Sequence, residues 1–326
     1  MSKSDEKRPS RVGQTVVVAM GGHAFMQAGE EGTHEQHGRN ARHICQQLMV
    51  LAERGYNIVI THGNGPQVGM LMRSVELARD TVPPLPLDVL VAQTEGSLGY
   101  YLQRALLNEL RQREIRRYVV TVVTQVLVDP EDPAFEEPTK PVGPFLTKED
   151  AEARRDEEGW IIKEDAGRGW RRVVPSPEPL KVIQRDMVRE AAGAGNIVVA
   201  AGGGGIPMCK ADDGDYVGVE AVIDKDLTSA VLATDVGAEL LIILTAVDAV
   251  ALNFGQPDEQ ILGAVTLAEC ARYMAEDHFP AGSMGPKVEA IHGFLQRGGR
   301  RGLITSPDRL IDALDGKAGT HFIGRI

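Results

Sequence analysis

The sequence has little of what several common functional classes need, beginning with cysteine. Its 326 residues include three cysteines, which are far apart and form no CxxC pair: Cys45, Cys209 and Cys270. An odd number at this spacing argues against a disulfide framework and against a cysteine-based zinc site. We therefore expect no protein-held metal.

Positive charge is also scarce. The chain has 35 Lys and Arg against 46 Asp and Glu, which gives a formal net charge of −11. Such a balance argues against a surface that binds nucleic acid or another polyanion. Any phosphate group that the protein binds must therefore meet positive charge placed locally.

Long hydrophobic runs are missing as well. Apolar stretches such as 240–244 are far too short to cross a bilayer, and the first residues, MSKSDEKRPSR, contain no apolar core of a secretory signal. These features predict a cytoplasmic protein without a membrane partner.

What the sequence does contain is an alternation of two kinds of segment. Buried parallel strands are typically short, continuous β-branched runs, and amphipathic patterns between them indicate helices. The alternation predicts a doubly wound α/β fold. The expected strands are 15–19, 57–61, 118–124, 196–201 and 240–245, and the expected helices include 36–54, which a capping box at Thr33–Gln36 precedes, 87–111, 180–192 and 287–296.

The segment 129–179 departs from this rhythm. It is rich in proline and acidic residues and holds both tryptophans, Trp160 and Trp170. A structureless loop of this length is unusual inside a compact domain. We interpret it as an inserted subdomain or lid, with a disordered linker as the alternative.

Three expected strands run directly into glycine. In an open α/β sheet, ligands bind where strands end, and glycine lets backbone N–H groups approach an anion closely. The sequence has no GxxxxGK(S/T) P-loop, and no GxGxxG follows the first strand, which weakens a dinucleotide-binding interpretation. The three turns are Met20–Ala24, Thr61–Gln67 and Ala201–Pro207.

Two lysines stand at the starts of expected helices, where acidic residues are normally preferred. Lys225 opens one helix and Lys287 follows Gly285-Pro286 at another. Phosphoryl transfer depends mainly on positioning and on neutralising charge, which suits lysines at such places. Asp226 is expected to orient Lys225. Asp224 is a helix cap, another orienting group, or an indirect partner of Mg²⁺.

Three histidines lie near the start of the helix expected after Thr33, and together they could suggest a metal site. They are His34, His37 and His43. We expect them to face solvent at the helix start with no fourth ligand, so the sequence predicts no metal there.

Six long strings of the sequence, in this order, resemble carbamate kinase within the amino-acid-kinase superfamily, and the resemblance covers about residues 16–320. The strings are HGNGPQVG at 62–69, PTKPVGPF at 138–145, KEDAGRGWRRVVPSP at 163–177, GGGGIP at 202–207, EAVIDKD at 220–226 and GSMGPK at 282–287.

The resemblance implies a three-layer αβα sandwich with a mostly parallel central sheet and a protruding lid subdomain, assembled as a homodimer. It divides the chain into a tail (1–13), an N-terminal lobe for the phosphoryl acceptor (14–128), the lid (129–179) and a C-terminal lobe for the nucleotide (180–326). Lys225 and Lys287 then match the catalytic lysines, Asp226 the aspartate that positions them, and Lys140 the lysine that the lid contributes.

The implied reaction is a reversible phosphoryl transfer between ATP and carbamate, with Mg²⁺ bridging nucleotide phosphates. In cells that ferment arginine, the useful direction makes ATP from ADP and carbamoyl phosphate. The residues expected to hold the acceptor and the phosphoryl group are Gly21, Gly22, His23, Gly63, Asn64, Gly65, Gly203 and Gly204. Those expected near the nucleotide are Thr245, Val247, Asp248, Val250, Asn253, Phe254, Met284 and Lys287.

Two positions depart from the family pattern. His23 stands where the family usually has asparagine, and Glu95 where it usually has glutamine. His23 could make activity titrate near pH ~6.5, and the two side chains could form a compensating pair. The alternatives are a kinase for another small carboxylate-like or carbamate-like acceptor, and a weakly catalytic ligand sensor on the same fold.

Overall fold

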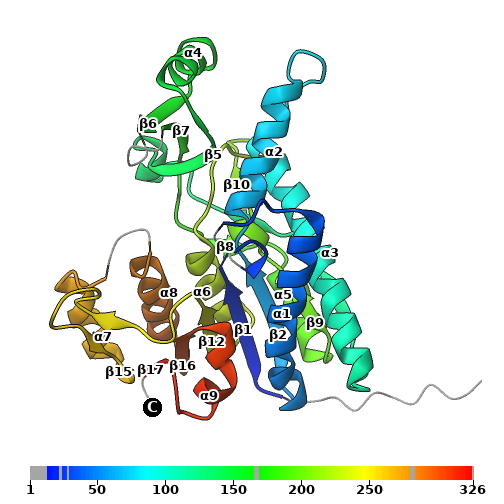
Figure 1. Ribbon diagram of the computed structural model, residues 1–326, viewed down its shortest axis with the longest axis vertical. Coiled ribbons are helices and arrows are strands. Elements are labelled where there is room, and N and C mark those ends of the chain that lie inside the picture. The colour runs from blue at the N-terminus through cyan, green and yellow to red at the C-terminus, as the bar shows by residue number, and fades with distance from the viewer. Residues whose placement is uncertain (1–12, 22–23, 28, 165–168, 280–282, 325–326) are drawn as a thin grey trace, which may run out of the picture.

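An eight-stranded sheet forms the centre of the computed structural model (Figure 1), which describes residues 13–21, 24–27, 29–164, 169–279 and 283–324. The strand order is β15-β17-β16-β12-β1-β2-β9-β3, and neighbouring strands are parallel except for β16 and β17. The strands are β1 (Thr15–Met20), β2 (Asn57–His62), β3 (Val119–Thr121), β9 (Ile197–Val199), β12 (Leu240–Leu244), β15 (Ala264–Thr266), β16 (Arg301–Thr305) and β17 (Thr320–Ile323).

Strand β1 shows why a continuous apolar run suits this position. Successive side chains of a strand point to opposite faces, and here both faces are covered. Val16 and Val18 belong to one hydrophobic core, whereas Val17 and Ala19 belong to the core on the other face. All four side chains are fully buried.

Helices form the outer two layers (Figure 1). One face of the sheet is covered by α1 (His34–Glu53), α3 (Leu87–Gln112) and α9 (Leu310–Leu314). The other face is covered by α5 (Arg185–Gly193), α6 (Lys225–Asp235), α7 (Leu267–Ala275) and α8 (Gly285–Gln296). This confirms the three-layer αβα architecture.

Smaller elements surround the central sheet. A second sheet has the order β11-β10-β4-β8, and β13 pairs with β14 in a short antiparallel ribbon. Helix α2 rises beyond the central sheet in Figure 1. Their bounds are β4 (Gln125–Leu127), β8 (Lys181–Val182), β10 (Ile206–Lys210), β11 (Tyr216–Gly218), β13 (Ala251–Leu252), β14 (Gln260–Ile261) and α2 (Gly65–Ala78).

The irregular segment has regular structure within it. A three-stranded antiparallel sheet of order β5-β7-β6 and one helix stand apart from the central sheet, at the top of Figure 1. The boundaries 129 and 179 stay a prediction. The elements are a 3₁₀ turn (Pro133–Phe135), β5 (Lys140–Leu146), α4 (Lys148–Glu158), β6 (Ile161–Glu164) and β7 (Trp170–Val174).

Two expected elements were wrong in extent. The run 118–124 is not one strand: β3 ends at Thr121 in the central sheet, and the chain then enters the second sheet as β4. The expected helix 180–192 begins only at Arg185, because Lys181 and Val182 pair with β4 as β8.

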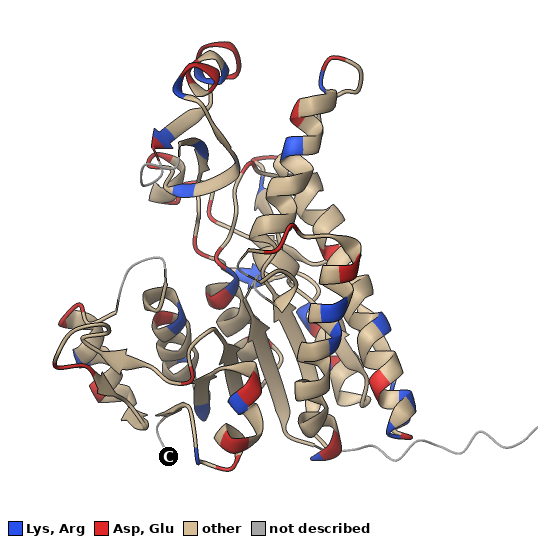
Figure 2. Cartoon of the chain, in the orientation of Figure 1, with Lys and Arg blue, Asp and Glu red and all other residues tan. Residues whose placement is uncertain are grey.

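The expected helix starts are confirmed. Thr33 caps α1 with a complete capping box, and α8 begins at Gly285 with proline in its first turn. Figure 2 shows both signs of charge along α1, α3 and α4. Among the described residues, no helix combines the length and the apolar character needed to cross a membrane.

Candidate functional site

The carboxyl ends of the central strands bring the glycine turns together. Met20, the last residue of β1, pairs with His62 of β2 on one side and with Leu244 of β12 on the other. The turns after these strands therefore share one edge of the sheet, and the N–H of Gly63 donates to the Met20 carbonyl at 2.9 Å. Gly21 lies at this edge, whereas Gly22 and His23 lie outside the described residues.

The turn after β9 approaches the turn after β2 closely. Gly203 has a φ of +68°, and a Cβ at this position would run into the side-chain amide of Asn64. Asn64 Nδ2 in turn donates to Thr94 Oγ1 of α3 at 2.8 Å. Glycine is needed at 203 both for its left-handed backbone and for this close approach.

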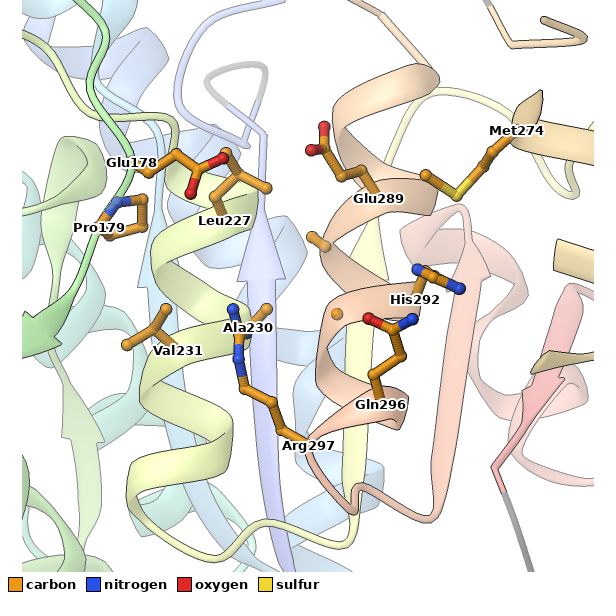
Figure 3. A pocket seen from close by; sticks show the side chains of 12 residues that line it. Glu178, Pro179, Leu227, Ala230, Val231, Met274, Glu289, His292, Gln296 and Arg297 are labelled. Carbon is orange, nitrogen blue, oxygen red and sulfur yellow. The ribbon is translucent and has the colours of Figure 1, made fainter. Parts of the chain in front are cut away.

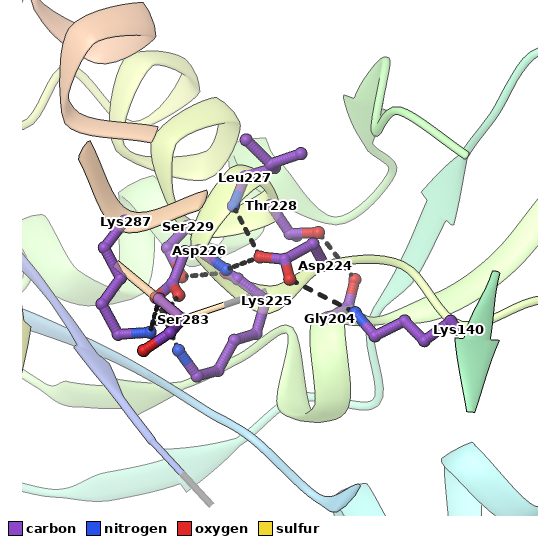
Figure 4. Close-up of polar contacts among 10 residues, drawn as sticks. All are labelled: Lys140, Gly204, Asp224, Lys225, Asp226, Leu227, Thr228, Ser229, Ser283 and Lys287. Atoms are coloured by element: carbon purple, nitrogen blue, oxygen red, sulfur yellow. Dashed lines mark hydrogen bonds and ion pairs between the residues drawn. The ribbon is translucent and has the colours of Figure 1, made fainter. Parts of the chain in front are cut away.

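Two predicted catalytic lysines meet at one buried aspartate (Figure 4). Lys225 Nζ lies 2.5 Å from Asp226 Oδ1, and Lys287 Nζ lies 3.4 Å from Asp226 Oδ2. Asp226 is 2% exposed, so water does little to screen these contacts. Two ammonium groups therefore share one carboxylate at the starts of α6 and α8.

Asp224 has two partners on different elements. It is the N-cap residue of α6, where its Oδ1 accepts from the Asp226 N–H at 2.8 Å, and its Oδ2 lies 3.2 Å from Lys140 Nζ of β5. Burial acts to raise the pKa of Asp224, but Lys140 and Lys225 act against it and the net pKa is lowered. Of the roles considered for Asp224, the structure thus shows the cap, together with a contact to Lys140 of β5.

These groups line one cleft of about 930 Å³. The cleft brings positive charge and glycine backbone to the same space, as phosphate binding requires. Of the predicted residues it is lined by Gly63, Asn64, Gly65, Gly203, Lys140, Lys225, Asp226 and Lys287, and Asp224 also lines it.

Two arginines in the cleft lining were not predicted, Arg73 of α2 and Arg171 of β7. Arg171 belongs to the quoted string GRGWRRVV, whose adjacent arginines were the available signal. Arg73 had no comparable signal, because one arginine on an amphipathic helix is ordinary.

The residues expected near a nucleotide lie mostly in the loop after β12. Asp248 Oδ1 accepts from Ser306 Oγ at 2.6 Å, and the N–H of Val250 donates to Thr320 Oγ1 at 2.8 Å. Val250 is fully buried, so its side chain belongs to the core. The residues that line the cleft do not include Thr245, Val247, Asp248, Val250 or Met284, although Met284 is the N-cap residue of α8, three positions before Lys287.

The model of the amino acid kinase family matches residues 14–306. The chain belongs to the amino acid kinase family. Membership of this family, together with similarity to carbamate kinases over nearly the whole chain, shows that the protein is a phosphotransferase.

Several relatives of this amino acid kinase are similar over nearly their whole length. A carbamate kinase of Thermococcus kodakarensis is 47% identical over 94% of this chain and 98% of its own. A carbamate kinase-like protein of Escherichia coli is 44% identical over 95% and 99%. The structure of carbamate kinase from Giardia lamblia bound to AMP-PNP has a TM-score of 0.92 at 40% identity, over 97% of this chain and 100% of that one.

The kinase has a second, smaller cavity, of about 240 Å³, between α6 and α8 (Figure 3). Glu178 and Glu289 lie at one end, and Arg297 lies at the other. Burial, followed by the charges of Glu178 and Asp224, raises the pKa of Glu289. None of the predicted site residues lines this cavity.

One of the three histidines on α1 was placed wrongly by the sequence. His34 and His43 are exposed, but His37 is 8% exposed and its Nε2 lies 3.1 Å from Gln67 Nε2. It faces α2 because the apolar stripe of α1 passes through this position. Over the described ranges, no group of three or more His, Cys, Asp or Glu side chains is arranged to hold a metal ion.

Proposed function

We propose that this kinase is a carbamate kinase, which transfers a phosphoryl group reversibly between ATP and carbamate. The observation that supports this most is that Lys140, Lys225 and Lys287 line one cleft together with residues of two glycine turns. Relatives named carbamate kinase, 47% identical over almost the whole chain, support the acceptor.

In this proposal the protein positions reactants and neutralises charge. In the direction that makes ATP, a β-phosphate oxygen of ADP attacks the phosphorus of carbamoyl phosphate. A new P–O bond forms to ADP, and the P–O bond to carbamate breaks, so carbamate leaves with the bonding electrons. No side chain needs to act as a nucleophile.

Each group around the cleft has a task in that step. Lys225 and Lys287 would neutralise the oxygens of the transferred group, with Asp226 fixing their separation. Lys140, carried by β5, would bring a third positive charge from the lid. The backbone N–H of Gly203, which also lines the cleft, would bind the same oxygens.

Magnesium would enter with the nucleotide as part of the substrate. The two cleft carboxylates, Asp224 and Asp226, are already engaged by lysines, which suits a cation held mainly by nucleotide phosphates. We accordingly propose MgATP and MgADP as the nucleotide substrates.

We further propose a role for each part of the chain. Residues 14–128 would bind the acceptor, residues 129–179 would form the lid, and residues 180–326 would bind the nucleotide through the loop at 245–250 and Met284. In support, the turn at Gly63–Gly65 comes from the first part and both Lys225 and Lys287 come from the last. We place the reaction in the cytoplasm, with ATP production from carbamoyl phosphate as its useful direction.

A coupled assay of ATP formation tests the acceptor. The protein is given MgADP with carbamoyl phosphate, or with acetyl phosphate as a matched acyl phosphate. We expect carbamoyl phosphate to be strongly preferred. Preference for acetyl phosphate would replace carbamate by another carboxylate acceptor, and tight nucleotide binding without turnover of either would favour a ligand sensor.

A further inference from the structure

One side of α2 faces the three-stranded sheet β5-β7-β6. The residues on this side are spaced three, four and three positions apart, as neighbours along one face of a helix are. They are Gly69, Met72, Glu76 and the C-cap residue Arg79. A Cβ on Gly143 of β5 would lie 3.3 Å from Met72 Cε, and a Cβ on Gly69 would lie 3.9 Å from the Gly143 backbone. The first half of this face therefore touches the sheet through apolar and small groups.

The second half of this face is charged, and it meets the charges of α4. Arg154 of α4 lies 2.8 Å from Glu76 Oε2 and donates to Glu158 Oε1 at 2.9 Å. Arg79 contacts the same two oxygens, Glu158 Oε1 in a hydrogen bond and Glu76 Oε2 at 3.6 Å. Each arginine therefore meets both glutamates, and the four residues form a closed ring of alternating charge. We call Glu76, Arg79, Arg154 and Glu158 the charge ring.

Helix α4 offers α2 charge rather than apolar surface. Its sequence is KEDAEARRDEE, and Ala151 is its one buried residue. Two pairs of the charge ring cross between the helices, Arg154–Glu76 and Arg79–Glu158. No other hydrogen bond or ion pair joins α4 to α2 in the described part of the chain. The four side chains are between 23% and 31% exposed, so solvent screens these pairs only in part.

The same two elements form two sides of the large cleft. Gly69 and Arg73 line it from α2, and Lys140, Phe145 and Arg171 line it from the sheet. None of the four residues of the charge ring is among the lining residues. The charge ring therefore joins the two sides beyond the cleft, and its contacts limit how far the two sides can separate.

The sheet is also attached to the rest of the kinase at its other end. Arg172 of β7 lies 2.7 Å from Glu220 Oε2, and the Val222 N–H donates to the Pro175 carbonyl at 3.0 Å. These contacts lie near Lys140, where β5 begins, whereas α4 follows the end of β5. With the charge ring broken, the sheet would be free to pivot about the end that these contacts hold.

We propose that the charge ring is a clasp that holds the sheet β5-β7-β6 against α2 and thereby sets the width of the cleft in which the phosphoryl donor is bound. Its four members do not line the cleft, so they are positioning residues that act through Lys140 and Arg171. The effect on catalysis rests on the proposed function, whereas the effect on the position of the sheet does not.

The clasp fixes a position rather than adding stability. Burial, followed by the charge of Glu158, raises the pKa of Glu76, although Arg79 and Arg172 lower it. The ionised form of Glu76 therefore gains less from neighbouring charge than it loses by leaving water. Partly buried ion pairs of this kind can select one arrangement without a gain in stability. We expect disruption of the charge ring to open the sheet locally, with little change in the free energy of unfolding.

Charge reversal in one helix at a time breaks the clasp without changing the net charge. Glu76→Arg with Arg79→Glu keeps the pair within α2 but places like charges opposite each other across the two helices. Arg154→Glu with Glu158→Arg does the same from α4, and we call these two variants the half reversals. All four substitutions together restore opposite charges across the helices and form the matched control. Arg154→Gln, which removes one guanidinium from the charge ring, is a milder variant.

Spin labels on the full chain measure the separation directly. The native cysteines are buried, so labels can be placed at Leu77→Cys on α2 and Ile161→Cys on β6, where the side chains are 80% and 46% exposed. We expect one narrow distance distribution without the reversals and in the fourfold variant. Each half reversal, and to a smaller extent Arg154→Gln, should give longer and broader distances. Distances that the half reversals leave unchanged, or that the fourfold variant does not restore, would overturn the clasp.

Steady-state kinetics separate positioning from a purely structural role. Each half reversal should raise KM for carbamoyl phosphate about tenfold and leave kcat unchanged, because substrate binding draws a mostly open population back to the closed state. Kd for MgADP should not change, and the fourfold variant should regain the wild-type KM. An unchanged KM in both half reversals would overturn the positioning role. A wild type inactive with carbamoyl phosphate would refute the proposed function and leave the distance measurement standing.

Discussion

Gly203 and Gly237 adopt nearly the same left-handed conformation, with φ values of +68° and +66°. They differ in surroundings, because a Cβ at 203 meets Asn64, whereas nothing lies within 4 Å of a Cβ at 237. Gly237→Ala should destabilise the fold by about 1–2 kcal/mol, the cost of a left-handed alanine, without affecting turnover.

Gly203→Ala should cost more, because Asn64 must also move, and it should lower kcat on the order of 10²-fold. Urea unfolding and steady-state kinetics on both variants check this. Equal kcat in the two would show that the approach of Gly203 to Asn64 does not matter for transfer.

Asp224 combines a cap and a charge, which two substitutions separate. Asparagine caps a helix as well as aspartate does, so Asp224→Asn should retain the cap of α6 and lose only the contact with Lys140. Asp224→Ala should lose both and be about 1 kcal/mol less stable than the asparagine variant.

The lowered pKa of Asp224 sets the pH range in which its negative charge stabilises the folded protein. A folded pKa below the ordinary 3.8 means that wild type is stabilised relative to Asp224→Asn at neutral pH. That advantage is lost as pH falls below about 4 through the folded pKa. Thermal unfolding at several pH values measures it, and an advantage that grows toward acid would be inconsistent with the assignment.

Strand β5 connects the three-stranded sheet β5-β7-β6 to the rest of the kinase. Val142 of β5 is 4% exposed and belongs to a small core with Val68 and Met72 of α2. Ion pairs of α4 with α2 add to this contact, including the half-buried pair of Arg154 with Glu76 at 2.8 Å.

Val142→Ala should therefore make β5, the strand that carries Lys140, more mobile. We expect the free energy of unfolding to fall by about 1–2 kcal/mol. Hydrogen exchange in β5 should be faster, and kcat/KM for carbamoyl phosphate should be lower. Ile161→Ala on β6, where the side chain is 46% exposed, is the matched control and should change none of these. Similar exchange in both variants would show that the core under β5 does not hold this strand in place.

Elements buried on both faces were the ones that the sequence predicted well. Runs such as TVVVA and NIVIT can only be satisfied by a covered parallel strand, so β1 and β2 were found. The run 118–124 was misjudged because β-branched residues suit either sheet, and nothing local marks where the chain leaves β3 for β4. Strand β6 reads IIKE and is mostly exposed, so it carries no such signal.

Site residues could be predicted where a residue type is unfavourable at its place in the secondary structure. Lysine at the start of a helix is such a case, and both Lys225 and Lys287 meet at Asp226. The hydrogen bond from the Thr124 N–H to Glu95, and the ion pairs of the charge ring, depend on contacts between distant segments. They could be recognised only once the fold had brought those segments together.

Helix α3 carries a surface that we expect to join two subunits. Tyr100 and Leu107 are 54% and 46% exposed, and Arg104 lies over the Tyr100 ring at 5.4 Å. The spacing of four and three residues puts all three on one face of the helix. Large apolar side chains left exposed together commonly mark an interface.

Light scattering should therefore give a mass twice the 35.2 kDa of the chain. Tyr100→Asp combined with Leu107→Asp should produce monomers, because buried carboxylates oppose association. Leu77→Asp on α2, where the side chain is 80% exposed, is the control and should remain dimeric. A monomeric wild type, or a dimer that survives the double substitution, would rule out this surface.

Lys225 and Lys287 meet at Asp226 in a cleft that glycine turns also line, and we propose that they neutralise the transferred phosphoryl group. The most direct measurement is the rate of ATP formation from MgADP and carbamoyl phosphate by wild type, Lys225→Ala, Lys287→Ala and the exposed control Lys317→Ala. We predict kcat losses of about 10²–10³-fold for the first two variants and none for the control. Wild-type rates in Lys225→Ala and Lys287→Ala would show that these lysines do not stabilise the transferred group.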